Sequence, residues 1–140
     1  MSPARPAKGG AYEAMTRDIL VRVTPAYLPA QSDPAENQFS WAYTVEIENH
    51  GSETVQLVSR HWIITDANNR VEHVKGPGVV GEQPVLKPRE AFRYTSGCPL
   101  TTPSGGMRGT YQMLTADGVA FDAAIPEFSL HMPEATKRMN

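Results

Sequence analysis

The feature that most constrains the fold is a strict alternation of apolar and polar residues between Phe39 and Glu48. Every second residue of this segment is aromatic or aliphatic, from Phe39 through Trp41 and Tyr43 to Ile47, and the residues between them are small or polar. Side chains of a β-strand point to opposite faces in turn, so such a strand has one apolar and one polar face. An α-helix would scatter the same residues around its circumference. The segment therefore predicts a strand that lies on a hydrophobic core.

Similar alternation and turn signals along the rest of the chain predict an antiparallel β-sandwich. Asn68-Asn69 and Asp117-Gly118 are typical of two-residue hairpin turns, and the 12 prolines disfavour long helices. An all-β immunoglobulin or fibronectin type III-like sandwich of about seven strands fits this pattern best. The predicted strands cover residues 19–23, 39–48, 55–66, 70–75, 90–96, 108–115 and 119–125, with a short closing segment at Phe128 and Leu130.

Length and composition predict one domain with a tail at each end. A chain of 140 residues has the usual size of a single domain. Residues 1–15 are rich in Pro, Ala, Gly and Lys, and residues 133–140 are similar. We therefore expect flexible tails around a sandwich domain at 16–132.

Charge and hydropathy exclude several classes of partner. The net charge of −2 and the pI of about 6.1 offer no basic surface, so we expect no nucleic-acid binding. No segment approaches the roughly 20 apolar residues of a membrane span, and the N-terminus lacks the apolar region of a secretory signal. Cys98 is the single cysteine, which excludes an internal disulfide and fits a reducing compartment. We expect a cytoplasmic protein without membrane insertion.

A G-x-G-x-x-G motif at Gly76, Gly78 and Gly81 suggests nucleotide binding, but its context argues against a dinucleotide site. Such a site needs a helix directly after the glycines, and here prolines follow at positions 84 and 88. We interpret the glycines as residues that permit a tight turn, a bulge or close packing at a sheet edge. The alternative is an anion nest of backbone N–H groups that binds a diphosphate or a nucleotide beside Lys75.

The histidines do not predict a metal site. None of the four lies in an H-x-H, H-x-x-x-H or H-E-x-x-H arrangement. If Asn68-Asn69 is a two-residue turn, His61 faces Gly76 and His73 faces Ile64 across the hairpin. His61 and His73 then point to opposite faces and cannot share one ion. We therefore predict no metal ligands and no cofactor.

The sequence offers no catalytic constellation either. Cys98 precedes a proline, and no base is assignable to it. A binding surface has better candidates, because strand alternation sends Arg60 and Trp62 to one face and His61 to the other. Trp62 is a core residue or part of an exposed Arg–Trp patch. The connection at 97–106 is a simple crossover or a recognition loop.

Long segments of the chain resemble the ApaG family between residues 17 and 130. The most specific are RHWIITD at 60–66 and GPGVVGEQP at 76–84. The resemblance implies a fibronectin type III-like sandwich in a bacterial protein linked to cobalt and magnesium tolerance or efflux. Similar domains occur in eukaryotic F-box proteins as interaction modules, and no enzymatic reaction is firmly attached to the family. Arg89 stands where the family usually has glycine.

Together these observations predict a non-enzymatic module that binds an unidentified protein partner. We place the contact surface on Arg60, His61 and Trp62, on the glycine segment and on the loop at 97–106. The alternative function is binding of a diphosphate or nucleotide at Gly76–Gly81. Exposed edge strands also permit a homodimer.

Overall fold

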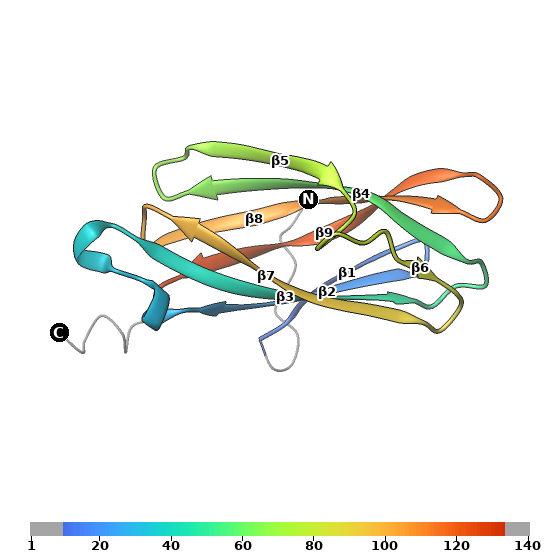
Figure 1. Ribbon diagram of the computed structural model, residues 1–140, viewed down its shortest axis with the longest axis horizontal. Helices are drawn as coiled ribbons and strands as arrows, with labels where there is room; N and C mark the ends of the chain where they lie inside the picture. Colours follow the sequence, from blue (N-terminus) through green and yellow to red (C-terminus); the bar gives the residue numbers. More distant parts are fainter. Residues whose placement is uncertain (1–9, 134–140) are drawn as a thin grey trace.

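The structure is a computed structural model that describes residues 10–133, and this part of the chain forms two stacked antiparallel sheets (Figure 1). It contains nine strands and two short 3-10 turns. The strands are β1 (Tyr12–Thr16), β2 (Ile19–Tyr27), β3 (Phe39–Asn49), β4 (Val55–Asp66), β5 (Val71–Pro77), β6 (Val85–Leu86), β7 (Ala91–Leu100), β8 (Ser104–Thr115) and β9 (Ala120–His131). The turns η1 (Pro29–Gln31) and η2 (Pro34–Glu36) connect β2 to β3.

The two sheets confirm the predicted sandwich. One sheet has the order β1-β2-β3-β7, and the other has the order β5-β4-β8-β9 with β6 paired to β4. β5 and β6 thus share one edge of β4, each against a different half of that strand. No helix lies between β5 and β7, so the glycine motif starts no βαβ unit. No helix among the described residues is long and apolar enough to cross a membrane.

All seven predicted strands are present, and the boundaries differ in instructive ways. β4 matches its predicted range, whereas β8 begins four residues earlier, at Ser104. β9 joins the predicted strand at 119–125 to the closing segment, so it runs through Pro126 to His131. The prediction of a flexible tail over residues 1–15 is wrong for residues 12–15, because Tyr12–Thr16 forms β1 and pairs with β2. The rest of that tail, residues 1–9, and positions 134–140 of the second tail lie outside the described residues.

The core lies between the sheets, where the alternating residues of β3 meet those of β4, β8 and β9. Five residues of β3 from Phe39 to Ile47 are buried at every second position. Their large partners come from the facing sheet, where Trp62, Tyr111 and Phe128 are buried. Removing this much apolar surface from water is the main driving force for the fold.

The outer face of the four-stranded sheet carries charges that pair with one another. The guanidinium of Arg22 contacts Glu13 at 2.7 Å, Glu48 at 3.1 Å and Glu46 at 3.6 Å. The hydrogen bond to Glu13 is the main reason why the pKa of Arg22 is raised, and Glu48 adds to it. Exposed ion pairs stabilise a fold only slightly, but in this network Arg22 and its three glutamate neighbours are already paired with one another.

Candidate functional site

The side chain of Arg60 lies against the backbone of the glycine segment and holds that segment in place. A register shift between Leu57 and Ser59 marks a β-bulge at Val58. After the bulge, Arg60 lies opposite Tyr111 on one side and Gly76 on the other. Its Nη1 donates to the carbonyl oxygens of Pro77 at 3.0 Å and Gly78 at 2.9 Å. A Cβ on Gly76 would lie 3.0 Å from both guanidinium Nη atoms, so glycine makes room for this arginine.

The glycine motif forms a tight turn, which agrees with the predicted turning role of the glycines. Val79 and Glu82 exchange backbone hydrogen bonds of 2.8 and 2.9 Å across Val80 and Gly81. Both central residues have positive φ, at 43° and 81°, which is typical of a type I′ hairpin turn. The side chain of Val79 is buried in the core. The segment bends the chain from β5 to β6 along the edge of β4.

The hydrogen bonds of this turn use backbone groups that an anion nest would need. The N–H of Gly78 donates to the carbonyl of Val58 at 2.9 Å, and the N–H groups of Val79 and Glu82 donate to each other's carbonyls. A nest binds an anion through free N–H groups that converge on it. These three N–H groups are already used within the protein and are not free to bind an anion. Binding of a diphosphate or nucleotide here stays a prediction.

His61 and His73 lie side by side, so the prediction that they point to opposite faces was wrong. His61 pairs with Lys75, and His73 pairs with Ile63, which puts both imidazoles on the outer face of the five-stranded sheet. Nε2 of His61 and Nδ1 of His73 are 2.9 Å apart in a hydrogen bond, with ring centroids 5.1 Å apart. The error came from the turn, because three residues and not two connect the paired Asp66 and Arg70. One additional loop residue reverses the relative facing of the two histidines.

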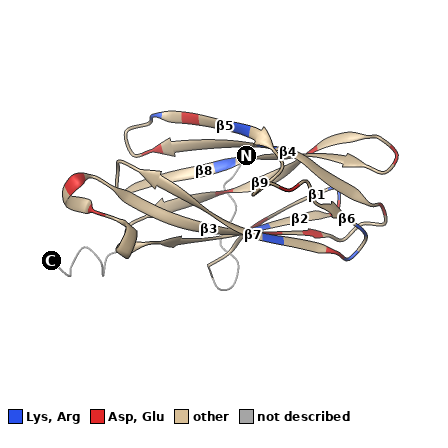
Figure 2. Cartoon of the chain, viewed as in Figure 1, with Lys and Arg blue, Asp and Glu red and all other residues tan. Residues whose placement is uncertain are grey.

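Basic neighbours surround this histidine pair. Desolvation lowers the pKa of His61, and the positive charges of Lys75, His73 and Arg108 lower it further, while Asp122 opposes them. Figure 2 shows basic residues on both β5 and β8. Arg60, His61, Lys75 and Gly76 together line a shallow depression of about 480 Å³. Four of the predicted site residues therefore do lie together.

Trp62 lies in the core, so the hypothesis of an exposed Arg–Trp patch is corrected. Its side chain is only 2% exposed. The indole packs edge-on against the rings of Tyr43 at 5.1 Å, Phe128 at 6.0 Å and Tyr111 at 6.4 Å between centroids. Such edge-to-face contacts stabilise a core beyond the area that they bury. Trp62 is thus unable to contact a partner without unfolding the sandwich.

The connection after β7 lies far from the glycine segment, so the predicted convergence of these two loops was also wrong. Thr102 accepts a hydrogen bond from the N–H of Ala67, directly after the end of β4. The glycine segment contacts Val58 near the beginning of β4. Along a strand, the distance between these two positions is about 25–30 Å. A single compact partner site cannot include both loops and the histidines.

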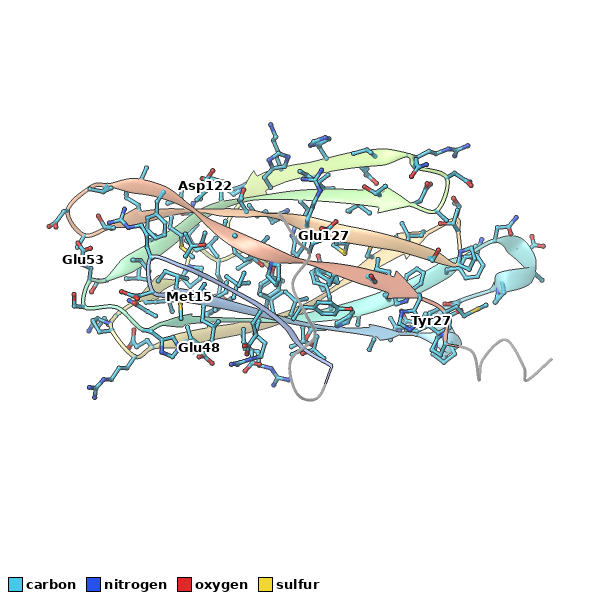
Figure 3. All side chains as sticks on the ribbon, turned by 180° about the vertical axis from the view of Figure 1, so that it is seen from behind. Met15, Tyr27, Glu48, Glu53, Asp122 and Glu127 are labelled. Atoms are coloured by element: carbon cyan, nitrogen blue, oxygen red, sulfur yellow. The ribbon has the colours of Figure 1, made fainter. Side chains whose placement is uncertain are left out.

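A larger groove of about 700 Å³ lies beside His61 on the outer face of the five-stranded sheet, and it reaches the β9 edge, where β1 of the other sheet borders it. Its apolar lining includes Ile63, Ala124 and Pro126. Arg108 and His61 line it from β8 and β4, Glu127 from β9, and Glu13 and Ala14 from β1. Figure 3 shows Glu127 midway along β9, on the side of the molecule opposite to the view of Figure 1.

Sequence reasoning missed this groove, although Pro126 was a usable signal. A proline inside a strand usually marks a bulge, and the pairing of β8 with β9 shifts register here, between Met107 and Gly109. One residue of β8, Arg108, thus faces two residues of β9, Pro126 and Glu127. The bulge bends β9 and helps to form the groove.

The described residues contain no group of three or more His, Cys, Asp or Glu side chains that could hold a metal ion. The thiol of Cys98 is buried, and desolvation raises its pKa to about 11. A thiol of this kind is almost fully protonated at neutral pH, and the protonated form is a poor nucleophile. The buried hydroxyls of Tyr94 and Tyr111 hydrogen-bond each other, and burial raises the pKa of both.

Fold and site together define a two-sheet β-sandwich protein with its accessible groove and histidine pair on the outer face of one sheet. The chain belongs to the ApaG family, because the ApaG domain matches residues 29–115. The Protein ApaG of Caulobacter vibrioides is 61% identical over 140 residues, which is 100% of both chains. The Protein ApaG of Paramagnetospirillum magneticum is 62% identical over 129 residues, with coverage of 92% of this chain and 99% of that protein.

Solved structures show the same fold. A Bordetella pertussis protein described as ApaA matches with a TM-score of 0.82 at 55% identity, over 86% of this chain and 98% of that chain. The C-terminal domain of wzt matches with a TM-score of 0.51 at 10% identity, over 96% of this chain and 83% of that domain. The second likeness shows only that the two proteins share a fold.

Proposed function

We propose that this protein is a non-enzymatic binding module that holds a segment of a protein partner on the outer face of its five-stranded sheet. The observation that carries the proposal is the groove of about 700 Å³ beside His61. Its apolar lining and its few charged residues have the composition of a recognition site. The outer face of the four-stranded sheet is less suited, since Arg22 already pairs there with Glu46 and Glu48.

The groove also suggests what the partner looks like. The half-buried side chains of Ile63 and Ala124 provide apolar contacts in the groove, and Arg108 is an exposed cation in its lining. A complementary segment is extended, carries one or two apolar side chains and has an acidic residue placed to meet Arg108. From family membership, the expected cellular role is in cobalt and magnesium tolerance. That role stays a prediction, as do the cytoplasmic location and a homodimer.

A comparative pull-down tests the proposal. Tagged wild-type protein, Ile63→Asp and Arg108→Glu are incubated with lysate of the native host, and bound proteins are quantified by mass spectrometry. Arg93→Glu on β7 is the matched control, because Arg93 is an exposed cation on the four-stranded sheet, opposite Glu46 in the strand register. We expect one set of proteins to bind wild type and Arg93→Glu alike, and to bind both groove variants at least about tenfold less, a loss of about 1.4 kcal/mol.

Two results would overturn the proposal. One is equal recovery of the same proteins by wild type and by both groove variants, with all samples folded by circular dichroism. The other is turnover of a phosphate ester by the purified protein, which would indicate an enzyme.

The Arg108→Glu variant is expected to fold, because Arg108 lies on the exposed outer face of β8 and its substitution leaves the core intact.

A further inference from the structure

The histidine pair on β4 and β5 brings two imidazole nitrogens within reach of one metal ion. Nε2 of His61 and Nδ1 of His73 are 2.9 Å apart, and both rings stand on the outer face of a hydrogen-bonded strand pair. Imidazole nitrogens bind first-row metals at about 2.0–2.1 Å. Two nitrogens at this separation therefore subtend an angle of about 90° at an ion that binds both of them.

We propose that His61 and His73 bind one late first-row transition-metal ion, with Cu²⁺ and Ni²⁺ as the preferred ions. An angle near 90° is the cis angle of square-planar and octahedral complexes, which these two ions favour. Tetrahedral Zn²⁺ needs a wider angle and so fits this pair less well. The site has two protein ligands, and water completes the coordination on the solvent side. This inference does not rest on the proposed partner binding, although His61 also lines the partner groove.

The strand pairing supplies the rigidity that two exposed side chains otherwise lack. His61 and His73 are anchored on neighbouring strands whose backbone register runs without interruption from Ser59 to Thr65. The strands hold the two side chains next to each other, which reduces the entropy lost on binding an ion. Each ring must still turn from its hydrogen-bonded orientation to point its nitrogen at the ion. The hairpin turn maintains this register, because the carboxylate of Asp66 accepts hydrogen bonds from the N–H groups of Asn68 at 2.8 Å and Arg70 at 3.0 Å.

The proton between the two rings must move before the metal binds. In the hydrogen bond, one of the two facing nitrogens carries a proton, while each metal bond needs a free lone pair. A neutral ring retains its proton by shifting it to its other nitrogen, so two neutral histidines release no proton. The positive charges of Lys75 and Arg108 lie near His61 and repel the ion, so we expect moderate affinity.

Titration of the full chain with Cu²⁺ and Ni²⁺ at pH 7.5 tests the site. Calorimetry gives stoichiometry and affinity, and pulsed electron paramagnetic resonance of the Cu²⁺ complex counts the bound imidazoles. The variants are His61→Gln, His73→Gln and the double variant. His50→Gln is the matched control, because His50 lies on the loop after β3, where it contacts Glu48 at 2.8 Å.

We expect one ion per chain, two imidazoles in wild type and one in each single variant. Each single variant should bind at least about tenfold more weakly, and the double variant should be little worse than either, because the two ligands act together. His50→Gln should match wild type. Unchanged affinity in His61→Gln and His73→Gln, or a single imidazole in the wild-type spectrum, would overturn the assignment. All three substituted side chains are at least partly exposed, so the variants are expected to fold.

Discussion

At the scale of single residues, the backbone of Arg89 stores strain that a glycine at this position would avoid. Glu90 N–H donates to the carbonyl of Lys87 at 2.9 Å, and Arg89 has a φ of 74°. With Pro88 before it, this is the pattern of a type II turn, whose third residue favours glycine. We expect Arg89→Gly to raise the free energy of unfolding by about 0.5–1 kcal/mol. Urea denaturation measures this change, and a destabilised variant would contradict the turn assignment.

The motif glycines also differ from one another at this scale. A Cβ at Gly78 would lie 2.1 Å from the carbonyl oxygen of Glu82, whereas a Cβ at Gly81 meets no atom within 4 Å. Both residues have positive φ. We expect Gly78→Ala to lower the free energy of unfolding by about 3 kcal/mol and Gly81→Ala by about 1 kcal/mol. Equal losses in thermal or urea denaturation would show that close packing is not what requires glycine at Gly78.

At the scale of elements, Asp66 organises the hairpin of β4 and β5. Its carboxylate accepts hydrogen bonds from two backbone N–H groups of the turn. Asp66→Ala removes both, so we expect a loss of about 1–2 kcal/mol in the free energy of unfolding. Asp117→Ala in the β8–β9 turn is the matched control, because the hydroxyl of Thr115 bonds that turn instead. Equal losses in the free energy of unfolding for Asp66→Ala and Asp117→Ala would contradict this role of Asp66.

This hairpin also shows how far the sequence predicts the structure. Period-two alternation located seven strands, because burial of one face dictates the pattern directly. It did not give the register, since Asn69 and Gly118 each end a three-residue loop in a left-handed conformation and both sequences also suit a two-residue turn. The histidine pair followed from that register and was therefore missed. The groove depends on the bulge at Pro126 and on β1, whose sequence resembles a tail.

At the scale of the whole molecule, the core makes stability depend on pH in the alkaline range. Burial raises the pKa of the Cys98 thiol to about 11 and raises the pKa of Tyr94 and Tyr111. An unfolded thiol ionises near its ordinary value of 9.0, so the unfolded state loses protons first as pH rises. Stability from this thiol is therefore complete below pH 9.0 and is lost as pH rises towards about 11.

We expect the urea midpoint to be constant from about pH 7 to 9 and to fall between about pH 9 and 11. In the Cys98→Ala variant the urea midpoint should fall less over this interval, because only the tyrosines then contribute to the fall. A midpoint that rises over this interval would contradict the burial of these groups. A slope that is unchanged in Cys98→Ala would assign the whole effect to the tyrosines.

The most direct measurement of the binding surface is a map of photo-crosslinks in living cells. A benzophenone amino acid replaces Ile63 or Ala124 in the groove, Val80 in the glycine turn, or Val119 at the β8–β9 hairpin. Val80 and Val119 are both well exposed, at 57% and 46%. We expect the probes at Ile63 and Ala124 to capture the same protein, and those at Val80 and Val119 to capture none. Capture from Val80 alone would place the binding surface on the glycine turn instead of the sheet.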